Sequence, residues 1–543
     1  MEHIDWHIGD AGHIAATGTA SADKTANRSF LVAGPASEGD YTLRCVFRRE
    51  PRFDTQGLMT TPYGFVLRFR DPENYYAVTL LPAGAIALVR MYGGEREILE
   101  QVRGYAPMYL DNYADLTVRK ATITVRLNGR VVLQTQDRSH VAGRVGFFCD
   151  GPQAITYRDI QLFQTGSVPF AYVPLLMVKA PYVIWASEDK GVLMWETNRP
   201  AAATVTYQPV NGGRKASVAV PPQGCVQRVV LSHLAPATRY EYRVHMEERN
   251  PGGGEFRTDP GPEGAFTAGF IGDTHASPER FKEFNRLLAQ HHPDFLINLG
   301  GVVDAAGHVD AWDAFFFRPG RRLFGRAPVY VAIGEQDQVP DRHWYNTFLP
   351  YPGSGMEVKD EAKSAYYALT YGNTAIVMVD NYFDFTPGSR QYEWLKSKLA
   401  SKRFQQATWR IVCGHEPPFS VGRGRWQPGN PDVREHLLPL CAEYGVQLLV
   451  GGKEHTYKRG RVDDVIVLVN GGGSGYSAPR AYQFGARLLG YSTLQYSIMR
   501  IKGDRLEWTC YSIRDEVIDR FVLENGETWP AGTAETGLTG DQP

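Results

Sequence analysis

The sequence predicts a multidomain protein in which two all-β units precede one α/β unit. At 543 residues the chain is too long for a single hydrophobic core. Short runs of alternating apolar and polar residues, separated by Gly, Pro, Asn and Asp, fill its first half. From about residue 264, apolar segments of strand length alternate with segments of helical periodicity. We expect folded units at 1–165, 181–263 and 264–525, a linker at 166–180 and a disordered tail at 526–543.

Residues 1–165 have the pattern of antiparallel strands, as in segments 41–47 and 75–80. Asn128-Gly129 lies between two such segments and predicts a hairpin, because this pair adopts the positive φ values of a type I′ turn. With the closing segment 143–162, the pattern resembles a jelly roll of the concanavalin or laminin-G kind. The Glu-x-Asp-x-x-Glu motif of glucanases with that fold is absent. The resemblance therefore implies a module that recognises a glycan or a protein, or that packs, without catalysis.

Segment 181–263 is predicted to form a second β-sandwich. Residues 229–244 resemble the L-x-P-x-T-x-Y-x-Y-R-V signature of fibronectin type III sandwiches. The first tyrosine of that signature, Tyr240, is expected to pack at a strand corner in a structural role. The sequences LMWET at 193–197 and FRTDP at 256–260 resemble the N-terminal sandwich of purple acid phosphatases. A phosphoesterase domain is therefore expected to follow.

Five short motifs close strand-like segments of the third unit. Carboxylates and imidazoles at strand ends are typical metal ligands in layered α/β folds. The order and spacing of the motifs resemble those of the calcineurin-like metallophosphoesterases, which read Asp-x-His, Gly-Asp-x-x-Asp, Gly-Asn-His-Asp/Glu, His and Gly-His-x-His. Here they are Asp273-Thr274-His275, Gly300-Gly301-Val302-Val303-Asp304, Gly334-Glu335-Gln336-Asp337, Gly414-His415-Glu416 and Gly452-Lys453-Glu454-His455. The third unit is thus expected to be a four-layer metallophosphoesterase domain of the purple-acid-phosphatase type.

Half of the positions that the resemblance marks as functional are replaced. A dinuclear site needs a carboxylate between cations ~3.5–4 Å apart, and Gly301 stands at that position. Glu335 replaces the ligand Asn, Gln336 replaces the His credited with helping the leaving group, and Lys453 replaces a ligand His. An ammonium group has no lone pair and repels metal ions. The sequence therefore predicts a degenerate metal site, in which Lys453 takes the place and charge of the second cation and Glu335 is its counter-ion.

The first-metal side is better retained. Asp273, His275 and His455 suit one Zn, Fe or Mn ion with open coordination positions, and the alternative is a hydrogen-bonded relic that holds no metal. His415, Lys453 and Glu335 are the catalytic candidates. Two further residues, in the loop after His415, are candidates for attracting an anionic substrate, although a solvated loop is the default for them: Arg423 and Arg425.

Three functions remain open at this point. The first is a phosphoester hydrolase, with one metal ion or none, acting on a phosphorylated or anionic small molecule. The second is a non-catalytic protein that binds a glycan or protein and uses the phosphoesterase unit as scaffold. The third is different acid/base chemistry by Lys453 and Glu335 in the same pocket. Fold alone does not choose among them.

Composition excludes some classes of partner. A net charge of −1 and a pI near 6.9 give no support for nucleic-acid binding. No segment has the ~18–20 apolar residues of a membrane-spanning helix. The six cysteines are dispersed and are expected to be separate buried thiols. The first residues lack the features of a signal peptide, so we expect a cytoplasmic protein as the sequence is written, or a secreted one if a leader has been removed.

Overall fold

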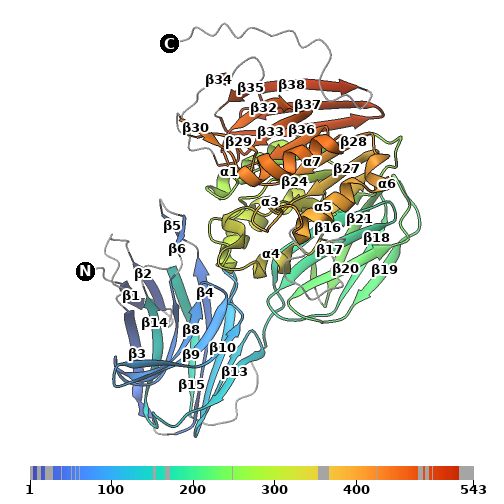
Figure 1. Ribbon diagram of the computed structural model, residues 1–543. Coiled ribbons are helices and arrows are strands. Elements are labelled where there is room, and N and C mark those ends of the chain that lie inside the picture. Colours follow the sequence, from blue (N-terminus) through green and yellow to red (C-terminus); the bar gives the residue numbers. More distant parts are fainter. Residues whose placement is uncertain are drawn as a thin grey trace.

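A computed structural model shows three β-rich units packed together, the first at the lower left of Figure 1, the second at the right and the third above. It describes residues 4–8, 14–18, 28–37, 39–50, 52–54, 57–59, 61–150, 154–164, 172–247, 249–351, 366–422, 425–474, 481–483, 488–491 and 493–524. The expected tail at 526–543 lies outside the described residues. No helix in the described part of the chain is long and apolar enough to cross a membrane.

The first unit consists of two antiparallel sheets that face each other. Alternate residues of their strands, such as Leu43, Cys45 and Phe47, fill the core between them. The Asn128-Gly129 turn has φ values of 50° and 81°, which confirms the expected hairpin. One sheet contains, in order, β1 (Ile4–Ile8), β2 (Ile14–Gly18), β15 (Ala154–Phe163), β4 (Tyr41–Glu50), β11 (Asn112–Arg119), β12 (Thr122–Leu127) and β13 (Arg130–Gln136). The other contains β10 (Glu95–Arg103), β9 (Ala85–Tyr92), β8 (Asn74–Leu81), β7 (Tyr63–Asp71), β14 (Gly143–Asp150) and β3 (Arg28–Ser37), beside a hairpin of β5 (Arg52–Asp54) and β6 (Gly57–Met59).

The second unit is a pair of smaller antiparallel sheets around the fully buried Trp195. Tyr240 accepts a hydrogen bond from the backbone N–H of Ala235 at 2.8 Å, a structural role. The first strand begins at Met177, inside the segment expected to be linker, so the linker is shorter than the sequence predicts. The sheets are β16 (Met177–Ala186), β17 (Lys190–Thr197) and β20 (Val226–Ser232), and β19 (Ala216–Val220), β18 (Ala203–Pro209), β21 (Arg239–Met246) and β22 (Arg249–Arg257).

The third unit contains two mixed sheets with helices outside them. One hydrophobic core lies between the two sheets and extends under the helix at residues 278–290. A second core lies between the eight-stranded sheet and the helices at residues 390–405 and 438–443. The six-stranded sheet is β25 (Val329–Val331), β24 (Phe295–Asn298), β23 (Phe266–Ile271), β36 (Gln495–Lys502), β37 (Arg505–Ser512) and β38 (Val517–Glu524). The eight-stranded sheet is β26 (Tyr367–Tyr371), β27 (Thr374–Met378), β28 (Trp409–Cys413), β31 (Leu448–Gly451), β33 (Val465–Asn470), β32 (Tyr457–Val462), β35 (Leu488–Tyr491) and β34 (Ala481–Gln483).

Helices occur only in the third unit among the described residues. Helix α1 begins at Pro278, after Ser277 caps it by accepting from the N–H of Arg280. The helices are α1 (Pro278–Gln290), α2 (Val309–Ala311), a π-helical turn (Trp312–Phe317), α3 (Arg318–Phe324), a 3₁₀ turn (Gln336–Gln338), α4 (His343–Phe348), α5 (Arg390–Leu399), α6 (Lys402–Gln405), a second π-helical turn (Val433–Leu437) and α7 (Leu438–Glu443). A short hairpin joins β29 (Phe419–Gly422) to β30 (Arg425–Pro428).

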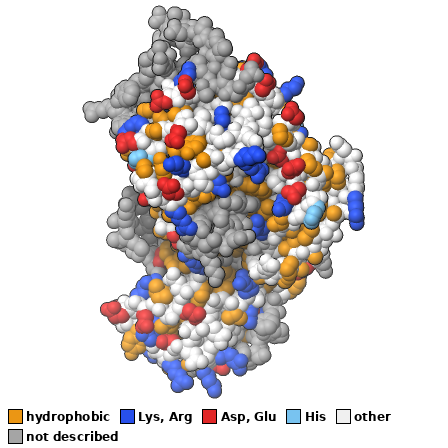
Figure 2. All heavy atoms as spheres, turned by 45° about the vertical axis from the view of Figure 1, so that its right-hand side comes forward, with side chains coloured by type: hydrophobic (Ala, Val, Ile, Leu, Met, Phe, Trp, Pro, Cys, Tyr) orange, Lys and Arg blue, Asp and Glu red, His pale blue; other side chains and the backbone are white. Residues whose placement is uncertain are grey.

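Buried charges join the three units. Lys179 of β16 pairs with Glu196 of β17 at 2.5 Å, and Tyr105 of the first unit donates a hydrogen bond to the same carboxylate. The Lys179 ammonium also lies 4.1 Å from the ring of Phe348 in α4. Arg49 of β4 forms a second buried ion pair, with Asp310 of α2. On the outer surface, acidic and basic side chains are intermixed over the upper part of the face in Figure 2, in keeping with the net charge of −1.

Candidate metal centre

The ends of four strands bring the expected motifs together. In the six-stranded sheet, β23 ends just before Asp273 and its parallel neighbour β24 ends just before Gly300. In the eight-stranded sheet, β28 ends before His415 and its parallel neighbour β31 ends before Lys453. Because parallel strands leave their carboxyl ends at one edge, each sheet offers its loops to the same site.

The backbone is strained at this edge. Asp273, Lys453 and His455 have φ values of 54°, 65° and 49°, in the left-handed region that costs a non-glycine residue about 1–2 kcal/mol. Such conformations persist where surrounding contacts impose them, and they concentrate at functional sites. Three such residues lie in the two facing loops that carry the candidate ligands.

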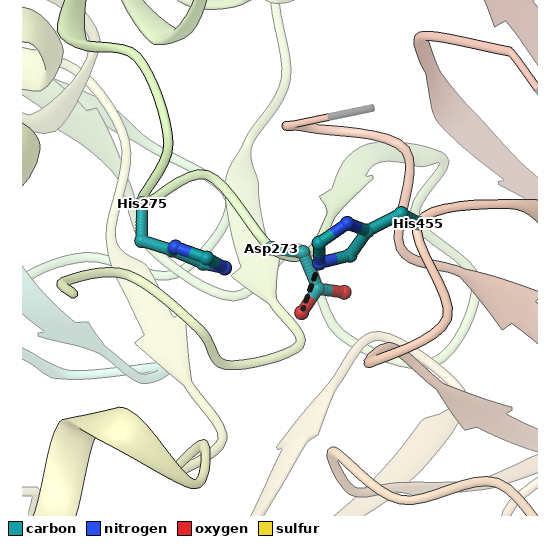
Figure 3. Close-up of side chains that lie close together, drawn as sticks. All are labelled: Asp273, His275 and His455. Atoms are coloured by element: carbon teal, nitrogen blue, oxygen red, sulfur yellow. Dashed lines mark ion pairs between the residues drawn. The ribbon is translucent and has the colours of Figure 1, made fainter. Parts of the chain in front are cut away.

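The ligand atoms of Asp273, His275 and His455 lie within 4.8 Å of one another. Figure 3 shows the two imidazoles on either side of the carboxylate, with Nε2 of His455 3.8 Å from Oδ1 of Asp273. That distance is too long for a hydrogen bond and close to the about 3.3–3.6 Å between two ligands of one tetrahedral cation. Asp273 is buried, and its Oδ2 accepts no hydrogen bond. The oxygen without a partner is Oδ2, on the same carboxylate whose Oδ1 faces His455, and a buried carboxylate in this state fits a metal ion.

His415 faces the same carboxylate. Its Nδ1–H donates to the carbonyl of Leu299 at 2.7 Å, which leaves the Nε2 lone pair 3.8 Å from Oδ1 of Asp273. The sequence predicted a catalytic role for His415, and its position also makes it a candidate fourth ligand. Burial lowers the pKa of His275 and of His415 to about 4, so both imidazoles are neutral and able to ligate. Burial also raises the pKa of Asp273 well above its usual range, a cost that a bound cation would remove.

Lys453 forms the expected ion pair with Glu335, with 3.2 Å between Nζ and Oε2. A second carboxylate, Glu416, contacts the same ammonium group, and it also accepts a 2.7 Å hydrogen bond from the hydroxyl of Tyr382. Burial lowers the pKa of Lys453, but the two carboxylates outweigh it, and the pKa lies above its ordinary value. The ammonium group is therefore a positive charge beside the candidate metal ligands.

Gly301 borders the candidate metal ligands Asp273 and His275 directly. A Cβ atom at this position would lie 2.8 Å from Oδ1 of Asp273 and 3.4 Å from Cδ2 of His275. A side chain here would thus enter the space between the two candidate ligands, where the resemblance puts the bridging carboxylate. The chain has no carboxylate at this point.

Asp337 holds the loop that contains Gly301. Its carboxylate accepts hydrogen bonds from the backbone N–H groups of Gly301, Val302, Val303 and Gly334 at 2.8–3.1 Å. The carbonyl of Gly301 in turn accepts from the N–H groups of Thr274 and His275. Asp337 therefore fixes the segment that presents the first two ligands.

Sequence reasoning missed several residues of the site. Asp380, Asn381 and Tyr382 come just after β27 and Val379, and a polar cluster at a strand end was the signal that could have found them. Oδ1 of Asn381 accepts from the backbone N–H groups of His415 and Glu416, and Arg342 pairs with the fully buried Asp380. Arg423 lies outside the described residues, and the backbone of Arg425 lies in β30 with its side chain undescribed.

Comparisons with known proteins agree with this geometry. A family model described as calcineurin-like phosphoesterase matches residues 266–457. These residues form a calcineurin-like phosphoesterase domain. The chain is also 25% identical over 289 residues to "Probable purple acid phosphatase 20" of Arabidopsis thaliana, covering 50% of this chain and 66% of that protein. It is 25% identical over 199 residues to "Probable inactive purple acid phosphatase 9" of the same plant, covering 32% and 30%. The chain thus spans between about a third and two thirds of these relatives.

A solved structure gives the same fold. Purple acid phosphatase PPD1 from yellow lupin (Lupinus luteus) seeds aligns with a TM-score of 0.55 and 14% identity, over 94% of this chain and 92% of that one. The likeness covers a multidomain, sheet-rich architecture that contains the phosphoesterase domain. At this identity it speaks to the fold alone.

Proposed function

We propose that the phosphoesterase domain binds one Zn, Fe or Mn ion through Asp273, His275 and His455 and hydrolyses a phosphoester with that single ion. The observation that carries the proposal is the buried Asp273 carboxylate, which has an unpaired oxygen and imidazole nitrogens at 3.8 Å. A buried carboxylate in such surroundings needs a cation or a proton. Phosphate esters are the substrates that the family relationship supports.

Hydrolysis joins the oxygen of water to phosphorus, breaks the P–O bond to the alcohol and delivers a proton to that alcohol. A bound metal ion would supply Lewis acidity towards a phosphoryl oxygen. Lys453 would donate a hydrogen bond to another phosphoryl oxygen, and His415, whose Nε2 carries a lone pair, would act as a further ligand of the ion. Glu335, whose side chain is 54% exposed beside Lys453, would accept a proton from water. Arg423 and Arg425 remain candidates for attracting the anionic substrate.

Metal content and turnover test this proposal together. Protein purified without chelator is expected to hold one equivalent of transition metal by elemental analysis. His455→Ala should lose most of that metal and at least 100-fold in turnover of nitrophenyl phosphate esters. His292→Ala removes an exposed imidazole near the end of α1 and should change neither. Two equivalents per chain, or turnover that survives complete metal removal, would contradict the proposal.

Two alternatives have support of their own. A non-catalytic binding or structural protein is favoured by the replaced ligands and by relatives whose names include "inactive". It predicts metal-loaded protein without turnover above background. Acid/base chemistry by Lys453 and Glu335 is favoured by their 3.2 Å contact, and it predicts activity that persists in chelator and disappears in Glu335→Gln.

For the first unit we propose recognition of a glycan or protein through an exposed face of a jelly-roll-type sandwich. The support is a sandwich of two antiparallel sheets without the glucanase carboxylate motif. The full chain should therefore bind on a glycan array without degrading any polysaccharide. Release of reducing ends from a bound polysaccharide would contradict this assignment.

A further inference from the structure

Lys453 contacts two carboxylates, whereas one would be enough to neutralise its charge. The sequence predicts a single counter-ion, Glu335, which would make the second-metal position neutral. In the structure Glu416 also contacts the ammonium, and its side chain is only 9% exposed. Tyr382 holds the Glu416 carboxylate in place by a hydrogen bond at 2.7 Å. The three charged groups together therefore carry a net charge of −1 at the position where dinuclear phosphoesterases have a cation.

The hydrogen bonds of the Lys453 ammonium group also limit how many negatively charged oxygens it can bind. A lysine ammonium has three N–H donors, and Glu335 and Glu416 take two of them. One donor is left for a phosphoryl oxygen. A second phosphoryl oxygen with its own negative charge would find no donor on Lys453, and it would lie near two carboxylates.

The charge of the substrate then decides which esters can enter. A phosphate monoester carries close to two negative charges at neutral pH because its second pKa is near 6. A phosphate diester carries one. In a site where Asp273, Glu335 and Glu416 face Lys453 and one divalent ion, the named charges cancel, so nothing is left to offset a second substrate charge.

We infer that the site accepts singly charged phosphate diesters and discriminates against doubly charged monoesters. The inference rests on the proposed single-metal hydrolysis. It assigns to Glu416 the selection of singly charged over doubly charged esters. In the reaction, water adds its oxygen to phosphorus, one ester P–O bond breaks, and the departing alcohol takes a proton. The product is a monoester that ionises a second time, so the same carboxylates that exclude monoesters promote release of the product.

Kinetics with charge-matched substrates test the inference. Metal-loaded protein is expected to hydrolyse bis(4-nitrophenyl) phosphate with at least a 10-fold higher kcat/KM than 4-nitrophenyl phosphate. Glu416→Gln keeps an oxygen acceptor for Lys453 and Tyr382 but removes the excess charge, and it should shift this ratio at least fivefold towards the monoester. Glu443→Gln removes a charge from the exposed end of α7 and should leave the ratio unchanged. A monoester preference in the parent or an unchanged ratio in Glu416→Gln would overturn the inference.

A binding measurement separates this inference from the proposed function. Calorimetric titration of metal-loaded protein should give a Kd for dimethyl phosphate at least 10-fold below that for methyl phosphate at pH 7.5, and Glu416→Gln should narrow the gap. Equal or reversed affinities would contradict the preference for diesters, even if the enzyme is active. Absence of turnover of every ester would instead remove the proposed hydrolysis, while the order of the two affinities would still decide the role of Glu416.

Discussion

At the scale of single residues, Lys453 is the clearest departure from a metal-binding site. Its ammonium group lies between the half-exposed Glu335 and the buried Glu416. Removing one partner of a buried ion pair costs about 3–5 kcal/mol, but Lys453 is more than a third exposed and solvent weakens the pair. The arrangement therefore stabilises the loop modestly while it fixes a charge in the site.

The first prediction concerns Lys453→Met. In chelator, this variant should lower the free energy of unfolding by about 1–2 kcal/mol, because two carboxylates lose their shared cation. Added Zn or Mn should restore the loss, because Glu335 and Glu416 beside His415 then form a cation site. Urea unfolding with and without metal, and a rise from one to two metal equivalents, check this. Lys502→Met, at the exposed end of β36, is the control and should show neither effect.

The sequence could predict which residues are retained or replaced, because each motif follows a recognisable apolar strand. It predicted the Lys453–Glu335 pair because opposite charges replace neutral ligands at two of the motifs. It could not predict Glu416 as the second partner, since the turn after His415 sets which way that side chain points. Asn381 holds this turn by accepting from the N–H group of Glu416, and Arg342 pairs with the neighbouring Asp380. These are contacts between distant segments that no local pattern records.

At the scale of elements, helix α1 and the hairpin at Asn128-Gly129 were predictable, because local capping and turn chemistry agree with the fold there. The helical segment 309–324 was not. Its run Trp312–Phe317 is almost wholly buried, so it lacks the polar face that gives a surface helix its periodicity. The start of β16 at Met177 was also missed, because proline and glycine nearby favoured a linker.

The second prediction belongs to the loop between β24 and α2. Asp337→Ala would leave four backbone N–H groups without their acceptor. Each buried unsatisfied donor costs about 1–3 kcal/mol, and partial relaxation makes about 3 kcal/mol in total a reasonable expectation. Metal affinity should fall as well, because Gly301 also holds Thr274 and His275. Urea unfolding and metal titration measure both effects.

Two further variants make this prediction specific. Asp337→Asn keeps the shape but turns an amide donor towards the N–H groups, so its loss should be intermediate. Asp432→Ala removes an exposed carboxylate and should stay within about 0.5 kcal/mol of the parent. Full metal affinity in Asp337→Ala would show that the loop does not position the ligands.

At the scale of the whole molecule, the three units meet at groups that are costly to separate. Lys179 and Glu196 are 1% and 3% exposed, and Tyr105 of the first unit and Phe348 of the third unit complete their surroundings. Arg49 and Asp310 form a second buried pair between the first and third units. Separating the units would expose or orphan these charges, so we expect the first sandwich to be held rigidly against the phosphoesterase domain.

The last prediction tests this coupling. Lys179→Met should cost about 3–5 kcal/mol, because Glu196 keeps its charge in a buried site without a cation. Lys179→Met with Glu196→Leu should cost clearly less, since no charge is then orphaned and the apolar replacements pack against Phe317 and Phe348. If the junction makes the units one cooperative body, the parent unfolds in urea in a single transition and only Lys179→Met releases the first sandwich to early proteolysis. Separate transitions in the parent, or a double variant as unstable as Lys179→Met, would mean that apolar packing alone joins the units and that the buried ion pair does not couple them.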